Sequence, residues 1–310
     1  MKKTAIFTGV GTAIVTPFRD GEIDYEALGN LVERQIAAGA QAIVAAGTTG
    51  EAATLTDGER AELYRRMRDM TRGRVCLILG TGSADTRRAI GYTRLAREVG
   101  ADGALVVTPY YNKGTREGIY RHYRAIAEEV GMPIILYNVP SRTGVNLDME
   151  QVRRLSRIPA VAGIKEAGDS AERLAQLSEI AARLPLYTGA DAMIYTTLAL
   201  GGAGVISVVS NLYPEDTVEI CKQFFAKNYR AAREIQHGFG GIVKALFLET
   251  NPAPVKYAMA RAGLCSPEMR LPMWLPTERS RRKIDRAMDE YEARRRGVSG
   301  KCEMRKGGAG

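Results

Sequence analysis

One lysine of this sequence lies where a buried amine could act as a nucleophile. Lys165 ends the apolar run at residues 161–165, and it is the only one of the 11 lysines that ends such a run. Burial disfavours the charged ammonium and frees the amine, which can form a Schiff base with a carbonyl substrate. The alternative is an ammonium paired with a neighbouring carboxylate, for which Glu166 is the candidate. From this residue alone both interpretations stay open.

Hydroxyl groups at the ends of other apolar runs could move protons for such a reaction. Tyr137 lies on the preceding run, and a phenol can transfer a proton while a carbinolamine forms and loses water. A buried tyrosine can also serve packing alone. The hydroxyls of Thr48 and Tyr111 could extend the relay.

Two further features suit carboxylate groups. Gly47 and Gly50 flank Thr48 and Thr49, so backbone amides and hydroxyls can approach a small carboxylate closely there. Arg142, expected on the rim, could grip a second carboxylate through two hydrogen bonds. A surface arginine often has no special role, so Arg142 by itself does not establish a carboxylate site.

Other kinds of site find little support. The two histidines, His122 and His237, lie in helical patterns, and the four cysteines show no C-x-x-C spacing, so we expect neither a metal nor disulfides. A G-x-S-x-G nucleophile motif is absent. No apolar run is long enough to span a membrane, and we expect no signal peptide. The scattered cysteines fit a reducing cytoplasm.

The composition indicates a globular protein with an uneven charge. Hydrophobic residues make up 45% and charged residues 25% of the 310 residues. The net charge is +9, and residues 278–310 alone hold 11 Lys or Arg against 6 Asp or Glu. Because the rest of the chain lacks a basic stripe, we expect no nucleic-acid binding and an unstructured, solvated tail at residues 297–310.

The elements that must position these residues alternate regularly. Eight apolar runs read as buried parallel strands, at residues 10–18, 42–47, 75–80, 104–108, 134–139, 161–165, 186–189 and 204–208. Helical patterns separate them, with starts at Asp24, Thr56, Asp85 and Thr115. This order predicts a (β/α)8 barrel, whose catalytic groups follow the strands. A doubly wound sheet is the alternative, but its glycine-rich phosphate turn is missing.

About 100 residues remain after the eighth strand, more than one closing helix requires. Helical patterns occur there at residues 214–225, 229–247, 254–262 and 278–296. We therefore predict three parts: the barrel strands at 1–213, a closing helix with a C-terminal helical appendage at 214–296, and the tail at 297–310.

Several of these motifs together resemble the dihydrodipicolinate synthase (4-hydroxy-tetrahydrodipicolinate synthase) family. The resemblance covers about residues 7–292, in order. It rests on G-T-T-G-E at 47–51, P-Y-Y-N at 109–112, Y-N-V-P-S-R-T-G at 137–144, G-I-K-E at 163–166, G-V-I-S-V at 204–208 and N-P-A-P-V-K at 251–256. It implies a TIM barrel, a homotetramer built as a dimer of dimers, and no cofactor.

The resemblance also implies a role for each residue of the reaction. Lys165 would condense with pyruvate to an imine and then an enamine, which attacks the aldehyde of aspartate-4-semialdehyde. Tyr137, Thr48 and Tyr111 would form the proton relay, with Tyr111 or Tyr110 reaching across a subunit interface. The product would enter diaminopimelate and lysine biosynthesis.

Four more residues would bind the substrates. Thr49 would hold the pyruvate carboxylate and Arg142 the semialdehyde carboxylate. The backbone at Gly189 and Ile206 would line the pocket around Lys165.

Two other functions stay open from the sequence. A Schiff-base aldolase or lyase for a 2-keto-3-deoxy sugar acid would share Lys165 and Tyr137, although residues 141–144 favour the synthase. A catalytically silent barrel could instead bind nucleic acid or a regulatory partner through its basic tail, but every expected catalytic position is occupied.

One departure from the family concerns inhibition by lysine. Many members bind lysine at the dimer interface through Ser, His, His, Asn and Glu. This chain has Ala52, Asp57, Arg60, Ala84 and Arg88 at the matching positions. Arg88 would place like charge against the ligand's ammonium groups, which Asp57 offsets only in part. We therefore expect weak or absent inhibition by lysine.

Overall fold

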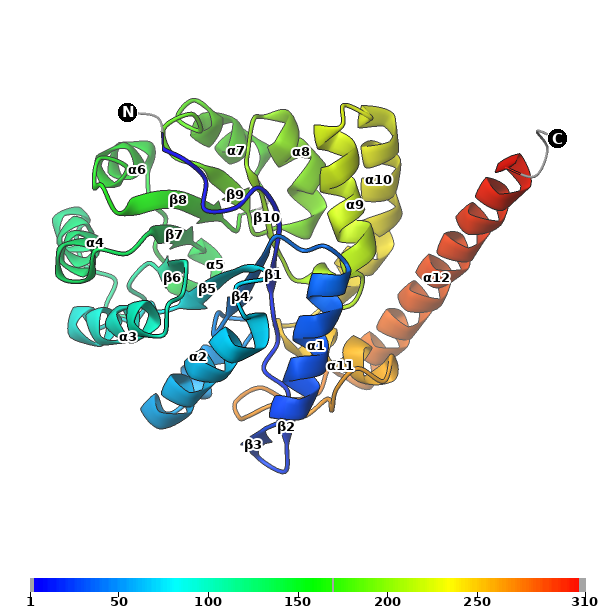
Figure 1. The fold of residues 1–310 in the computed structure, drawn as a ribbon, viewed down its shortest axis with the longest axis horizontal. Coiled ribbons are helices and arrows are strands. Elements are labelled where there is room, and N and C mark those ends of the chain that lie inside the picture. Colours follow the sequence, from blue (N-terminus) through cyan, green and yellow to red (C-terminus); the bar gives the residue numbers. More distant parts are fainter. Residues whose placement is uncertain (1–2, 169, 307–310) are drawn as a thin grey trace.

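Eight parallel strands close into a barrel in the computed structural model, which describes residues 3–168 and 170–306. Neighbouring strands follow the order β1-β10-β9-β8-β7-β6-β5-β4 (Figure 1). The strands are β1 Gly9–Ala13, β4 Ala42–Ala45, β5 Cys76–Gly80, β6 Gly103–Val107, β7 Ile134–Asn138, β8 Val161–Glu166, β9 Leu186–Thr188 and β10 Gly204–Ser207. The predicted (β/α)8 barrel is confirmed, and the doubly wound alternative is wrong.

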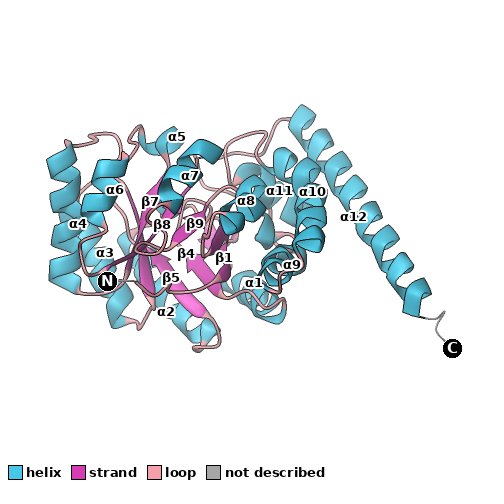
Figure 2. Ribbon diagram, turned by 90° about the horizontal axis from the view of Figure 1, so that it is seen from above, coloured by secondary structure: helices cyan, strands magenta, loops and turns pink. Residues whose placement is uncertain are grey.

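Helices cover the outside of the barrel, so almost every strand residue is buried on both faces (Figure 2). At the end where the strands begin, the ring of Phe7 stacks on that of Tyr187, with centroids 4.5 Å apart. The Tyr187 hydroxyl donates to the Phe7 carbonyl at 2.7 Å. Phe7 and Tyr187 belong to the apolar cluster that fills the interior of the barrel.

The helices begin where the sequence predicts them. Asp24, Thr56, Asp85 and Thr115 each accept a hydrogen bond from a backbone N–H of the first turn, as N-cap residues do. The helices from the first to the ninth are α1 Tyr25–Ala37, α2 Asp57–Thr71, α3 Thr86–Glu98, α4 Arg116–Val130, α5 Pro140–Thr143, α6 Met149–Leu155, α7 Ala171–Ser178, α8 Ile194–Ala199 and α9 Pro214–Phe225. Short 3-10 turns occur at Ala52–Thr54, Asp191–Met193 and Val209–Asn211.

The first predicted strand was too long. It ends at Ala13, and Phe18 belongs instead to a small hairpin of β2 (Phe18–Arg19) and β3 (Glu22–Ile23). Asp20 and Gly21 connect these strands, both with positive φ (54° and 84°), which is the backbone of a tight hairpin turn. The Asp-Gly pair was the available signal for this turn.

The chain after the barrel is helical. Helix α9 packs against β1 and closes the barrel, and α10 (Tyr229–Leu246), α11 (Ala253–Arg261) and α12 (Glu278–Lys306) follow. Helix α12 packs on α10 over its first half, where the rings of Tyr291 and Phe239 lie 5.4 Å apart, and then projects away from the barrel (Figures 1 and 2). It continues to Lys306, past residue 297, where the sequence predicts the order to end. Residues 307–310 lie outside the described residues. None of the described helices is long and apolar enough to cross a membrane.

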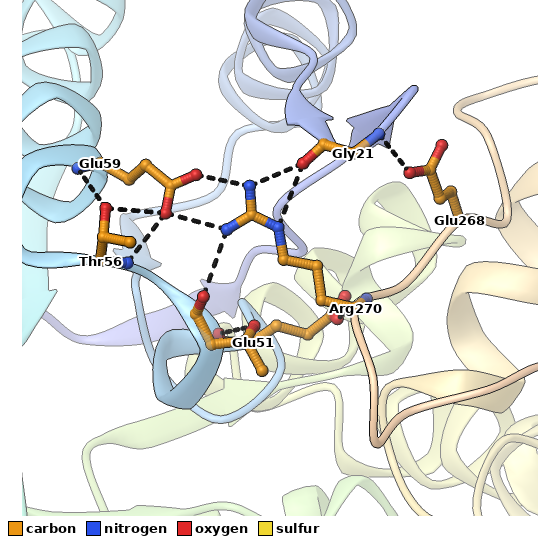
Figure 3. Close-up of polar contacts among 7 residues, drawn as sticks. Gly21, Glu51, Thr56, Glu59, Glu268 and Arg270 are labelled. Atoms are coloured by element: carbon orange, nitrogen blue, oxygen red, sulfur yellow. Dashed lines mark hydrogen bonds and ion pairs between the residues drawn. The ribbon is translucent and has the colours of Figure 1, made fainter.

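Arg270, between α11 and α12, joins this C-terminal segment to the barrel. Its guanidinium donates to the Gly21 carbonyl at 2.7 Å and pairs with Glu59 on α2 at 2.5 Å (Figure 3). Glu59 also completes the capping box of α2 by accepting from the Thr56 backbone N–H at 2.8 Å. One carboxylate therefore holds both a helix start and the C-terminal segment.

The pH dependence of stability tests this contact. The Arg270 guanidinium lowers the pKa of Glu59 from 4.5 to about 2. The contact therefore stabilises the fold fully above pH ~4.5, and this contribution is lost as the pH falls toward 2. Glu59→Gln keeps a capping-box side chain but loses the charge, and we expect a loss of about 1 kcal/mol at pH 7 that shrinks below pH 4.5.

Urea unfolding of both proteins from pH 7 to pH 3 measures this difference. Glu62→Gln, which alters an exposed ion pair on the same helix, is the control and should change the free energy of unfolding by less than about 0.5 kcal/mol. A loss for Glu59→Gln that stays constant down to pH 3 would contradict the assignment.

Candidate active site

Lys165 and Tyr137 lie side by side in the barrel, as the sequence predicts. They are register partners on β8 and β7. Each side chain is buried, at 6% exposure. The Lys165 Nζ lies 4.3 Å from the centroid of the Tyr137 ring, so the amine faces the aromatic ring that carries the phenol. A phenol this close to the amine can deliver or accept a proton when the amine reacts.

Lys165 has no carboxylate partner among the described residues. Glu166, the next residue on β8, points to the other face of the strand, as successive strand residues do. There it pairs with Arg173 at 3.2 Å and accepts a hydrogen bond from Asn138 at 2.9 Å. The alternative of a structural Lys165–Glu166 pair is therefore wrong. The amine of Lys165 is buried and is not engaged in an ion pair.

The strands after β8 shape the wall around this amine. A Cβ at Gly189 would lie 2.7 Å from the Lys165 Cε, so only glycine leaves room for the lysine side chain. Ile206 on β10 is fully buried among the residues that fill the barrel. Asp191 is buried beside them, and its Oδ2 accepts from the Val208 and Val209 backbone N–H groups at 3.1 and 3.0 Å.

Asp191 is an acid for which the sequence motifs predicted no role. Burial raises its pKa, while its hydrogen bonds and the positive charge of Lys165 act in the opposite direction. Its carboxylate therefore contributes to the electrostatics around the amine without forming an ion pair with it. Its place directly after β9 was the signal that could have found it.

The loop after β4 carries Thr48 and Thr49. A Cβ at Gly50 would lie 3.2 Å from the Ala46 nitrogen and the Ile14 carbonyl oxygen, so glycine lets this loop pack closely on the neighbouring backbone. Thr49 is buried, at 3% exposure. Its hydroxyl accepts a hydrogen bond from the Asn251 side chain at 2.9 Å.

A buried ion pair fixes the end of this loop. Glu51 has a left-handed backbone (φ 52°) and pairs with Lys256 of α11 at 2.6 Å, with both side chains at most 1% exposed. The Lys256 ammonium also donates to the Thr16 carbonyl at 2.8 Å, and the second Glu51 oxygen accepts from the Arg270 backbone N–H at 3.1 Å. Burial lowers the pKa of Lys256, and Glu51 opposes that shift.

Arg142 lies on the rim after β7, in the short helix α5, and is exposed. Its Nη2 donates to the backbone carbonyl of Asn251 at 2.8 Å. Asn251 therefore contacts both residues to which the sequence assigns carboxylate binding, Arg142 and Thr49. Reading strand ends could not find Asn251, because it lies outside the barrel strands. The N-P-A-P-V-K motif, which begins at Asn251, was the signal.

Tyr110 and Tyr111 do not join this group within the chain. Tyr111 is 94% exposed, with a left-handed backbone (φ 67°), and Tyr110 is 40% exposed. A side chain this exposed is not packed against Lys165 or Tyr137 of its own chain. A part for Tyr111 in a proton relay stays a prediction, and it requires a second subunit.

The residues that match the lysine-binding positions of other family members contact one another in this chain. Arg88 pairs with Asp57 at 2.9 Å, and the Tyr92 hydroxyl donates to the same carboxylate at 2.6 Å. Arg60 lies over the Tyr92 ring and donates to the Ala52 carbonyl at 2.6 Å. The guanidinium groups of Arg60 and Arg88 thus both lie near the Asp57 carboxylate. Among the described residues, no cluster of histidine, cysteine and acidic side chains could hold a metal ion.

The Glu51–Lys256 pair predicts a specific pattern of stability changes. Lys256→Met leaves the Glu51 carboxylate buried without its partner, and we expect a loss of about 3–5 kcal/mol in the free energy of unfolding. The double variant Glu51→Gln/Lys256→Met removes that charge as well and should lose less than the single variant. Urea unfolding measures both. Lys244→Met, at an exposed lysine of α10, is the control; a loss for Lys256→Met no larger than that of the control would refute the prediction.

Comparisons with known proteins agree with this geometry. Residues 6–291 match the model of the dihydrodipicolinate synthetase family. The 4-hydroxy-tetrahydrodipicolinate synthase of Nitratidesulfovibrio vulgaris strain Miyazaki F is 48% identical over 272 residues, which cover 86% of this chain and 92% of that protein.

Solved structures give the same result. The 4-hydroxy-tetrahydrodipicolinate synthase of Methylacidiphilum fumariolicum SolV superposes with a TM-score of 0.92 at 38% identity, covering 95% of this chain and 99% of that one. The chloride-inhibited dihydrodipicolinate synthase of Acinetobacter baumannii, solved in complex with pyruvate, superposes with a TM-score of 0.90 at 40% identity, covering 92% and 99%. The order of the motifs, the barrel and the buried lysine agree with these matches, and the chain belongs to the dihydrodipicolinate synthetase family.

Proposed function

We propose that this protein condenses pyruvate with L-aspartate-4-semialdehyde to give 4-hydroxy-tetrahydrodipicolinate, in diaminopimelate and lysine biosynthesis. The observation that carries the proposal is the buried Lys165 amine, which faces the Tyr137 ring and has no carboxylate partner among the described residues. A lyase of this kind needs a nucleophilic amine and a nearby proton donor, and the pair supplies both.

The covalent steps follow from the chemistry of an amine and a keto acid. The Lys165 amine adds to the keto carbon of pyruvate, and the resulting carbinolamine loses water to give an imine. Loss of a proton from the methyl carbon gives an enamine, which forms a carbon–carbon bond to the aldehyde carbon of the semialdehyde. The aldehyde oxygen takes up a proton and becomes the hydroxyl group. Attack of the substrate's own amine on the imine then closes the ring and releases Lys165.

The neighbouring residues have separate tasks in this scheme. Tyr137 transfers protons while the carbinolamine forms and loses water, with Thr48 and Tyr111 as the further members of the relay. Thr49 binds the pyruvate carboxylate. Arg142 binds the semialdehyde carboxylate. The backbone at Gly189 and Ile206 lines the pocket.

The exposure of Tyr111 supports a multimeric enzyme. A relay residue that is 94% exposed in its own chain needs a second subunit to cover it, with Tyr110 beside it at the interface. We propose a homotetramer built as a dimer of dimers, acting in the cytoplasm on small-molecule substrates. The reaction requires no cofactor because the lysine imine itself accepts the electrons of the broken C–H bond.

Trapping with borohydride tests the proposal. Reduction of the pyruvate imine should add about 72 Da to the protein, as expected for pyruvate plus two hydrogens less water. We expect the adduct on the wild type and on Lys244→Met, and its absence from Lys165→Ala, all read by intact-mass spectrometry. An unmodified wild-type protein would overturn the Schiff-base mechanism. Turnover with aspartate semialdehyde, set against cleavage of a 2-keto-3-deoxy sugar acid, then identifies the acceptor.

The arginines at the position of the lysine-binding site predict weak inhibition by lysine. A dibasic ligand would meet Arg60 and Arg88 there, and a desolvated contact between like charges costs several kcal/mol by rough estimate. Initial rates should therefore change little with millimolar L-lysine, compared with sodium chloride at the same ionic strength. Strong inhibition by lysine alone would show that Asp57 compensates for the two arginines.

A further inference from the structure

Asn251 links the two groups that hold substrate carboxylates in the proposed function. Its side-chain Nδ2 donates to the Thr49 hydroxyl at 2.9 Å, and its backbone carbonyl accepts from the Arg142 Nη2 at 2.8 Å. Asn251 is buried, with a relative exposure of 7%. Among the described residues, no other residue forms hydrogen bonds with both of these side chains. We infer that Asn251 is a positioning residue, which orients Thr49 through its side chain and Arg142 through its backbone.

The direction of the first hydrogen bond decides what Thr49 can do. A threonine hydroxyl has one proton to donate and two lone pairs that accept. Because the Asn251 amide donates to this hydroxyl, the hydroxyl proton is left for another acceptor. A pyruvate carboxylate is an acceptor of that kind. An acceptor in place of the amide N–H would take the proton and turn the hydroxyl away from the substrate.

The other end of the Asn251 side chain supports this role. Its Oδ1 is buried and has no hydrogen-bond partner among the described residues. A buried polar atom without a partner destabilises the fold, so packing alone would be served better by an apolar side chain of similar size. The hydrogen bond from the Asn251 amide to Thr49 therefore explains why an asparagine side chain is present at this position.

The backbone contact acts on Arg142 in a different way. Arg142 is exposed, and a free arginine side chain loses much rotamer freedom when it grips a ligand. The Asn251 carbonyl holds Nη2 and leaves the other N–H groups of the guanidinium for a carboxylate. Lys256 lies in α11, the helix that begins two residues after Asn251, and its ion pair with Glu51 fixes this helix beside the carbonyl.

Separate kinetics for the two substrates test the inference, which rests on the proposed function. Asn251→Leu removes the side-chain donor and keeps the backbone carbonyl. We expect the KM for pyruvate to rise about tenfold and the KM for aspartate semialdehyde to change by less than about twofold. A residue with a merely structural role would move both constants together, or neither.

A double-mutant cycle shows whether Asn251 acts through Thr49. In a Thr49→Val background, Asn251→Leu should raise the KM for pyruvate no further, because the hydroxyl that it orients is already gone. Asn251→Asp is the second variant, and its side chain is close in size to that of asparagine. Its carboxylate would accept the Thr49 proton, so the KM for pyruvate should rise at least as much as in Asn251→Leu.

The outcomes separate the inference from the function beneath it. A wild type that forms the pyruvate adduct and turns over both substrates, with an unchanged KM for pyruvate in both Asn251 variants, overturns the inference and leaves the function standing. A wild type without the adduct overturns both. Thermal unfolding of each variant shows that it is folded during the measurement.

Discussion

The buried ion pair between Glu51 and Lys256 is the interaction on which the arrangement of the site depends. Removing both charges from water costs several kcal/mol per ion, and only a close contact with further hydrogen bonds offsets that cost. The structure provides these bonds from the Thr16 carbonyl and the Arg270 backbone N–H. The pair therefore requires that the loop after β4, the segment after β1 that contains Thr16, and the C-terminal segment all fold together.

The site is consequently divided between two parts of the chain. Strand register brings Lys165 and Tyr137 together, and this needs only the barrel. Thr49 and Arg142 are instead held by Asn251, which precedes α11. The amine and the proton donor that we propose are thus placed by the sheet, while the groups proposed to bind carboxylates contact the segment that precedes α11. The chain after the barrel therefore belongs to the structure of the proposed site rather than being an addition to it.

This division also explains which features could be predicted from the sequence. Parallel strands place their ends on one rim, so reading those ends was enough to bring Lys165 and Tyr137 together. The contacts of Asn251 with Thr49 and Arg142 join residues 202 and 109 positions apart, and no periodicity reports such a contact. The hairpin at Asp20 was hidden because the apolar run before it looks like one long strand.

The protein also contains an internal comparison for its reactive amine. Lys165 and Lys256 are the two buried lysines of the described residues. The Lys256 Nζ is held by a carboxylate and a backbone carbonyl, and its contacts make it a structural cation. The Lys165 Nζ faces the Tyr137 ring and has no ion-pair partner among the described residues. An ammonium tied to a carboxylate must break that contact before it can attack a carbonyl group. An unpaired amine next to a phenol has no such contact to break. The difference between the two lysines therefore lies in their partners rather than in their burial, and it is the reason for proposing Lys165 as the reactive amine.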